Sequence, residues 1–204
     1  MIGRGILDRA LEYSFCACNS LGAKRLILKS IRWEKPRNGW LTQNSDGLAA
    51  GNSGTTRGGG LIRDGNGEWV TGFARKFGTA TSFLAELWTL QDGLLLCLQV
   101  HAQAVFIELD AKVTVDAFNL QTYSNTIVSS IMDDCRHLVT QILQTRFKRV
   151  YREANRCADF LAKLGTSLER DFIVFSSPHV DLLSILKANA SGLYKLCPKP
   201  LFAV

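Results

Sequence analysis

Four acidic residues stand where local structure alone would not favour them. Asp46 interrupts a segment that otherwise favours a strand, and Asp110 directly follows the apolar run 104–109. Strand interiors seldom contain aspartate, and the carboxyl ends of strands in α/β sheets commonly carry ligand sites. Glu86 and Asp159 lie among apolar residues near the starts of two predicted helices. Together the four residues could supply a cluster of carboxylate oxygens.

Such a cluster is suited to divalent metal chemistry. Magnesium prefers oxygen ligands and retains several of its waters. Two ions roughly 3.5–4 Å apart can activate an attacking water and stabilise the leaving oxygen when a phosphodiester is cleaved. Without cations, four converging carboxylates would repel one another and raise each other's pKa. If the four acids converge, we therefore expect them to bind metal.

Each acid also has a structural explanation. A negative charge near a helix N-terminus is stabilised by the helix dipole, which accounts for Glu86 and Asp159 without any chemistry. Asp159 can also pair with Lys163 one turn later. Asp46, which is followed by glycine, is typical of a turn, and Asp110 could cap the helix after it. Spacing alone leaves both interpretations open.

The elements that must position these residues form an ordered series. Strands are predicted over 41–50, 58–63, 68–74, 104–109 and 146–151, and helices over 81–100, 112–120, 127–143 and 154–164. The tetrapeptide Asp64-Gly-Asn-Gly67 favours a hairpin, because Asn and Gly tolerate the positive φ of tight turns. Glycines 58–60 inside a strand indicate close backbone approach. This order predicts an α/β fold with a five-stranded mixed sheet, three antiparallel strands followed by parallel ones, and helices on both faces.

The chain divides by composition into three parts. Residues 1–32 read as a helical and basic extension, residues 33–166 as the domain, and residues 167–204 as a proline-containing tail packed on it. The 204 residues carry a net charge of +6, which favours phosphate-bearing partners. The six cysteines show no zinc-type spacing, and no apolar run could span a bilayer. We expect a soluble, intracellular, monomeric protein that is not bound to membranes, in the nucleus or the cytoplasm.

The sequence resembles the plant reverse-transcriptase-like group of RNase H type 1 domains, which are derived from retroelements. The matching stretches cover about residues 33–166 and occur in the order of the family. They are Trp33-Glu-Lys-Pro…Gly39-Trp40, Asn44-Ser-Asp-Gly47, Gly58-Gly-Gly-Leu-Ile-Arg-Asp64…Gly67, Ala85-Glu-Leu-Trp88, Glu108-Leu-Asp-Ala111 and Tyr151-Arg-Glu-Ala-Asn-Arg-Cys-Ala-Asp-Phe-Leu-Ala162. Each stretch is weak by itself, and together they are specific.

The resemblance implies an RNase H-like fold and hydrolysis of the RNA strand of an RNA–DNA hybrid, with two Mg²⁺ ions that Mn²⁺ can replace. Carried over by position, the catalytic and metal-binding residues are Asp46, Glu86, Asp110 and Asp159. Asp46 and Asp110 would form the central pair. Glu86 would help place the nucleophilic water, and Asp159 would complete the second metal site.

The resemblance also implies roles for residues around the acids. The backbone at Gly47 and the side chain of Asn155 would contact the substrate, and Glu108 would support the site or the fold. The family commonly has a histidine ten residues before the last acid, where this chain has Arg149. Arginine cannot act as a general base but can hold a phosphate. We therefore expect slower turnover with Arg149 as a substrate-binding residue. The alternative is a catalytically weak or inactive nucleic-acid-binding remnant of a retroelement.

Overall fold

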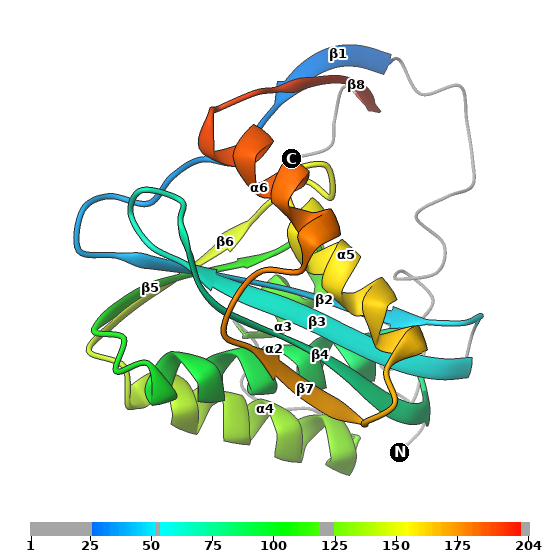
Figure 1. Ribbon diagram of the computed structural model, residues 1–204. Helices are drawn as coiled ribbons and strands as arrows, with labels where there is room; N and C mark the ends of the chain where they lie inside the picture. The colour runs from blue at the N-terminus through cyan, green and yellow to red at the C-terminus, as the bar shows by residue number, and fades with distance from the viewer. Residues whose placement is uncertain (1–25, 52–53, 119–124, 201–204) are drawn as a thin grey trace.

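The domain is built on a mixed sheet of six strands in the order β6-β5-β2-β3-β4-β7. The computed structural model describes residues 26–51, 54–118 and 125–200. The strands are β1 (Leu26–Ile31), β2 (Leu41–Ala49), β3 (Gly54–Arg63), β4 (Trp69–Ala80), β5 (Ala104–Leu109), β6 (Gln144–Arg149), β7 (Phe172–Phe175) and β8 (Lys195–Pro200). The helices are α2 (Ser82–Gln99), α3 (Lys112–Phe118), α4 (Thr126–Thr140), α5 (Arg156–Leu164) and α6 (Leu183–Ala190), with 3₁₀ turns at Gly165–Ser167 and Val180–Leu182 (Figure 1).

The directions of the strands follow the predicted pattern. Strands β2, β3 and β4 form an antiparallel meander, whereas β2, β5 and β6 run parallel. The turn between β3 and β4 is the predicted hairpin, in which Gly67 has a φ of +85° and Asp64 accepts hydrogen bonds from the backbone of Asn66 and Glu68. The five predicted strands and the α/β fold with its mixed sheet are thus confirmed. A sixth strand, β7, adds antiparallel to β4 at the edge.

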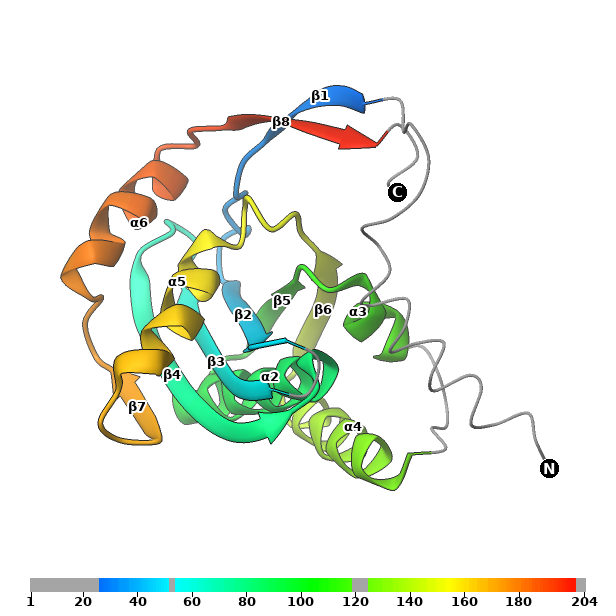
Figure 2. The same cartoon turned by 90° about the vertical axis from the view of Figure 1, so that its right-hand side faces the viewer.

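Helices cover both faces of the sheet (Figures 1 and 2). Because side chains alternate along a strand, Val105, Ile107 and Leu109 of β5 enter the larger core beneath α2 and α4. Phe106 and Glu108 point to the other face, where α5 packs on β2 and β3. There a smaller core joins Leu61 and Leu161 to Leu182 of the C-terminal segment.

The two ends of the described chain meet in a separate two-stranded sheet. Strand β1 pairs antiparallel with β8, and this ribbon lies beside the main sheet (Figure 2). Strand β1 occupies the end of the segment for which the sequence indicates a basic linker. The helix predicted near the N-terminus, together with Cys16 and Cys18, lies outside the described residues.

The described residues carry neither disulfides nor membrane-spanning elements. Cys97, Cys135, Cys157 and Cys197 are free thiols. Within the described ranges, every helix is too short or too polar to cross a membrane.

Candidate metal centre

Two parallel strands bring the first two acids together. Strand β2 pairs with β5 in a register that places Asn44 beside Glu108, so Asp46 and Asp110 lie opposite each other two residues further on. Asp46 is 3% exposed, and Asp110 follows the last residue of β5. Because parallel strands end at the same edge, the predicted convergence of these two side chains follows directly from the fold.

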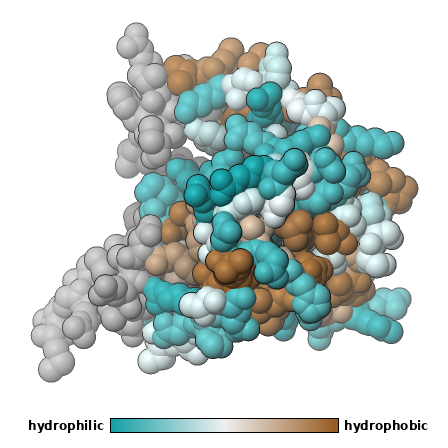
Figure 3. Space-filling model, turned by 90° about the vertical axis from the view of Figure 1, so that its left-hand side faces the viewer, coloured by the Kyte–Doolittle hydropathy of each residue, from teal (hydrophilic) through white to brown (hydrophobic). Residues whose placement is uncertain are grey.

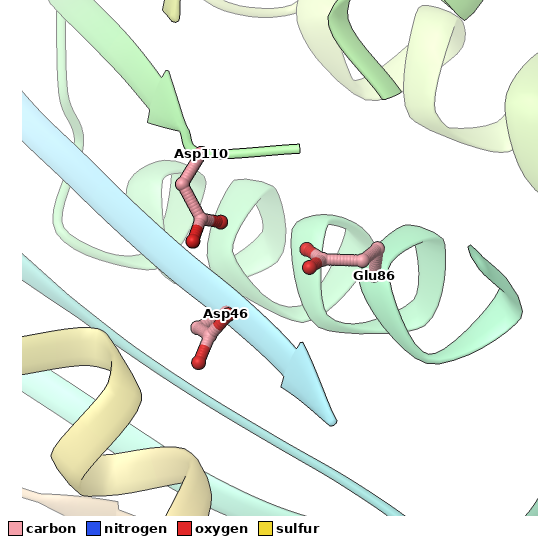
Figure 4. A group of neighbouring side chains, drawn as sticks. All are labelled: Asp46, Glu86 and Asp110. Carbon is pink, nitrogen blue, oxygen red and sulfur yellow. The ribbon is translucent and has the colours of Figure 1, made fainter. Parts of the chain in front are cut away.

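The helix α2 adds the third acid. Carboxylate oxygens of Asp46, Glu86 and Asp110 lie within 4.8 Å of one another, and the three side chains face a common point from β2, α2 and β5 (Figure 4). Gly47 makes this approach possible, because a Cβ atom at that position would overlap the backbone of Glu86. The observed contact of Gly47 is therefore with the helix.

Burial makes this cluster electrostatically costly. Burial, together with the charges of Asp110 and Asp159, raises the pKa of Asp46 to about 8. Burial, followed by the charges of Asp46 and Asp110, holds the pKa of Glu86 well above its usual range. The pKa of Asp110 is also raised, mainly by burial, although the cation of Arg152 opposes the rise.

The donor set fits a divalent cation. One buried oxygen of each acid, Oδ2 of Asp46, Oε2 of Glu86 and Oδ1 of Asp110, has no hydrogen-bond partner among the described residues. Unpartnered buried acceptors are unfavourable, and hard oxygen ligands are those that Mg²⁺ and Mn²⁺ prefer. These three residues could hold such an ion.

Asp159 lies beside this group but is held by cations. It sits in the first turn of α5, where its carboxylate accepts from Arg152 at 3.2 Å and from Lys163 at 2.5 Å. The predicted i,i+4 pair with Lys163 is thus present. Asp159 is nevertheless near enough to raise the pKa of both Asp46 and Asp110. The structure thus brings three of the four acids into one group and places the fourth at its border.

The remaining predicted residues occupy different environments. Asn155 is 1% exposed, and its Nδ2 donates to the carbonyl of Ser45 at 2.9 Å, which ties the start of α5 to β2. Arg149 is exposed at the end of β6, where it pairs with Leu109 in the sheet. Arg149 therefore lies on the strand next to β5, and β5 ends immediately before Asp110.

Glu108 supports the fold. Its Oε2 accepts from Trp33 Nε1 and from Asn44 Nδ2, each at 2.9 Å. The buried guanidinium of Arg63 donates to Asn44 and lies over the Trp33 ring at 3.5 Å. This network fixes the segment before β2 onto the sheet, so Glu108 has the structural role that the sequence left as one alternative.

The sequence motifs did not identify Arg152 as a residue of the site. It lines the same cleft of about 350 Å³ as Asp46, Glu86 and Asp110, and it lowers the pKa of all three acids. Its position seven residues before Asp159 is within the Tyr151–Ala162 stretch, but sequence offers no sign that the turn before α5 aims it at the acids. A cation at the mouth of an acidic cleft can hold a phosphate.

Comparison with known proteins identifies related sequences and folds. A family described as reverse transcriptase-like matches residues 44–165. An Arabidopsis thaliana protein named "Putative ribonuclease H protein" is 32% identical over 166 residues, which are 81% of this chain and 27% of that protein. The chain thus spans about a quarter of the length of this relative.

Solved structures share the fold at lower identity. Ribonuclease H1 of the archaeon Halobacterium salinarum matches with a TM-score of 0.59 and 22% identity, covering 62% of this chain and 97% of that one. LC11 ribonuclease H1, solved in complex with an RNA/DNA hybrid, matches with a TM-score of 0.56 and 21% identity, covering 61% and 94%. At these identities the likeness concerns the fold.

Proposed function

We propose, because this chain belongs to the reverse transcriptase-like family of RNase H domains, that it is a metal-dependent endonuclease that hydrolyses the RNA strand of RNA–DNA hybrids. The observation that carries the proposal is the convergence of Asp46, Glu86 and Asp110, whose oxygens lie within 4.8 Å of one another. A ribonuclease H1 of the same fold has been solved with an RNA/DNA hybrid, which supports this substrate class.

Different residues of the chain would have different roles in cleavage. Asp46 and Asp110 would hold divalent cations between the two parallel strands, and Glu86 would orient a water from the side of α2. When bound, such cations lower the pKa of a bound water and offset charge on the phosphate. Arg152, 63% exposed at the side chain, has donors beyond the one that contacts Asp159, and these would hold a phosphate oxygen of the RNA strand.

Asp159 would join the site only when its carboxylate turns from its cations toward a metal ion. Arg152 and Lys163 both compete for that carboxylate. We therefore propose that three acids form the standing site and that Asp159 completes a second ion site when substrate engages Arg152. Mg²⁺ would be the working ion, with Mn²⁺ as a substitute.

The test is cleavage of an end-labelled RNA–DNA hybrid in Mg²⁺ by the full chain. Asp110→Asn keeps the size of the side chain but weakens metal binding, so cleavage should fall by at least about 100-fold. Asp116→Asn, on the exposed face of α3, is the matched control and should cut as the wild type does. Cleavage that survives Asp110→Asn would exclude this mechanism.

A second candidate is a nucleic-acid-binding module with little activity. Two observations favour it: cations hold Asp159, and Arg149 stands where the family commonly has histidine. Wild-type chain that binds the hybrid in Mg²⁺ without cutting it would support this candidate over the nuclease.

A further inference from the structure

A basic cleft lies on the sheet away from the acidic group. The guanidinium of Arg37 lies 4.3 Å from the centroid of the Trp40 ring, and that of Arg146 lies 5.7 Å from the same ring. The Trp40 ring packs against the Phe106 ring, with the two ring centroids 4.5 Å apart and the planes tilted by 39°. Two cations from distant parts of the sequence therefore converge on one buried indole, which restricts their motion.

The register of the sheet builds this arrangement. Thr42 of β2, Phe106 of β5 and Arg146 of β6 form one row across three parallel strands, and all three line a cleft of about 220 Å³. The loop before β2 closes its side with Lys35 and Arg37. Hydrophilic side chains form a broad band across this side of the molecule (Figure 3).

Charge in the cleft is only partly balanced. Lys148 is paired with Glu34 at 2.8 Å and lies 3.7 Å from the buried carboxylate of Glu108. Within the described ranges, no carboxylate lies at ion-pair distance from Arg37 or Arg146. Two guanidinium groups beside one ring repel each other, and an anion placed between them would relieve the repulsion.

We propose that this basic cleft binds the phosphodiester backbone of a nucleic acid. Planar guanidinium groups recognise phosphate through paired hydrogen bonds, and each neutralised phosphate releases counterions. The proposal rests on the proposed function only in taking an RNA–DNA hybrid as the preferred ligand. Binding at this cleft does not require cleavage.

The cleft is placed to act together with the acidic group. Phe106 lies on β5, and Asp110, four residues later, directly follows the end of that strand. Even-numbered positions of β5 point to the face on which α5 packs. Four residues of strand span roughly 13 Å. A duplex presents a phosphate about every 3.4 Å of axis on each strand, so this span corresponds to about four phosphates. One hybrid could thus reach both places.

Binding in EDTA tests the proposal without cleavage. A fluorescein-labelled 20-base-pair hybrid is titrated with the full chain at several salt concentrations, and the anisotropy is read. Arg37→Gln and Arg146→Gln should each weaken binding by roughly 3- to 10-fold and reduce the salt slope by about 1. Arg37→Lys keeps the charge and should retain the slope. Lys187→Gln, an exposed charge on α6, is the matched control and should bind as the wild type does.

Several results would overturn the proposal. Unchanged affinity and slope in both arginine variants would do so, as would an equal loss in Lys187→Gln, which would indicate net charge alone. Displacement of the hybrid by polyglutamate as readily as by unlabelled duplex would assign the cleft to acidic protein. Displacement by millimolar inorganic phosphate would assign it to small anions. Absence of Mg²⁺-dependent cutting with normal arginine effects would instead reject only the proposed nuclease function.

Discussion

Charge is unevenly distributed around the acidic group. Asp110 raises the pKa of Asp46, and both of these acids raise the pKa of Glu86. Arg152 lowers the pKa of all three acids. A single exposed guanidinium cannot neutralise three buried carboxylates, because water screens it. The site therefore gains most from cations that bind directly between the oxygens.

Arg149 stands at the position where the family commonly has a histidine. Arg149→His places a group with a pKa near 6.5 at the position that is histidine in the family, and it should raise the rate of hybrid cleavage, by up to about 100-fold. The increase should depend on pH between about 5 and 8. Arg149→Gln is the control, since it removes the charge without adding a titratable group. Equal rates for the histidine and glutamine variants, measured in steady state, would assign no proton-transfer role to this position.

Asp92 is buried on α2, away from the acidic group. Burial raises its pKa from the ordinary 3.8 to about 6, despite the ion pair with Arg75 at 2.6 Å. Because the folded state holds this proton more tightly, Asp92 contributes stability below pH 3.8 that is lost as the pH rises through 6. The difference corresponds to about 3 kcal/mol at most.

Asp92→Asn removes this titration. The stability of the variant relative to wild type should therefore rise by about 1–3 kcal/mol between pH 4 and pH 7, as measured by urea unfolding. Glu68→Gln, in the exposed hairpin turn, serves as the control and should show no such change. Parallel pH profiles for Asp92→Asn and wild type would show that the burial of Asp92 has no effect on its ionisation.

The sequence predicts the position of a site residue where the backbone geometry of the sheet alone sets that position. Asp46 and Asp110 could be predicted to meet, since parallel strands end at one edge. The pairing of Asp159 with two cations depends on rotamers of Arg152 and Lys163, which no spacing specifies. The substrate contact of Asn155 stays a prediction, and its hydrogen bond to the carbonyl of Ser45 on β2 arises only in the folded chain.

At the scale of elements, glycines set how closely helices approach the sheet. Gly47 on β2 lets α2 pack closely against that strand. Gly59 on β3 does the same for α5, because a Cβ at Gly59 would overlap the backbone of Ala162. These two contacts bring Glu86 and Asp159 toward the same strands. The glycines at 58–60 were predicted to mark close backbone approach, and backbone atoms at Gly59 and Gly60 confirm it. At Gly58 the atoms that a Cβ would overlap belong to the side chains of Thr89 and Phe77.

Gly59→Ala should displace α5 and destabilise the fold by about 1–3 kcal/mol. Asp159 would move with the helix, so hybrid cleavage should fall more than the loss of folded protein explains. Gly65→Ala is the matched control, since a Cβ there would make only ordinary contacts at 3.7 Å. The measurements are thermal unfolding and cleavage by the folded fraction. If Gly59→Ala were as stable and active as Gly65→Ala, the packing of α5 would not depend on the absence of a side chain at Gly59.

Short elements were harder to predict than long ones. The helix α2 has a cap and an apolar face, and Thr81 accepts a hydrogen bond from Leu84 N as a capping residue should. Strand β7 has only four residues, and it forms because the open edge of β4 lies beside it. The local sequence pattern does not show that β4 offers an open sheet edge at this place.

At the scale of the whole molecule, the chain ends are joined through contacts that are distant in sequence. Strand β1 pairs with β8, and Ile31 and Trp33 pack on Ala154 before the start of α5. Pairing between residues separated by most of the chain is not encoded in any local window, so the ribbon could not be predicted. We propose that residues 33–166 form the catalytic domain and that residues 167–204 pack on it.

Leu182 tests whether the C-terminal segment is part of the same folding unit. Its side chain is fully buried against Leu61 and Cys157 in the smaller core. Leu182→Ala should therefore lower the free energy of unfolding of the whole chain by about 2–5 kcal/mol, in one cooperative transition. Leu193→Ala, at a side chain 67% exposed, should have little effect. If Leu182→Ala left the main transition unchanged and only loosened residues 167–204 to protease, that segment would be an independent appendage. Because Cys157 lies two residues before Asp159, a shared transition would also mean that the C-terminal segment stabilises the helix bordering the metal centre.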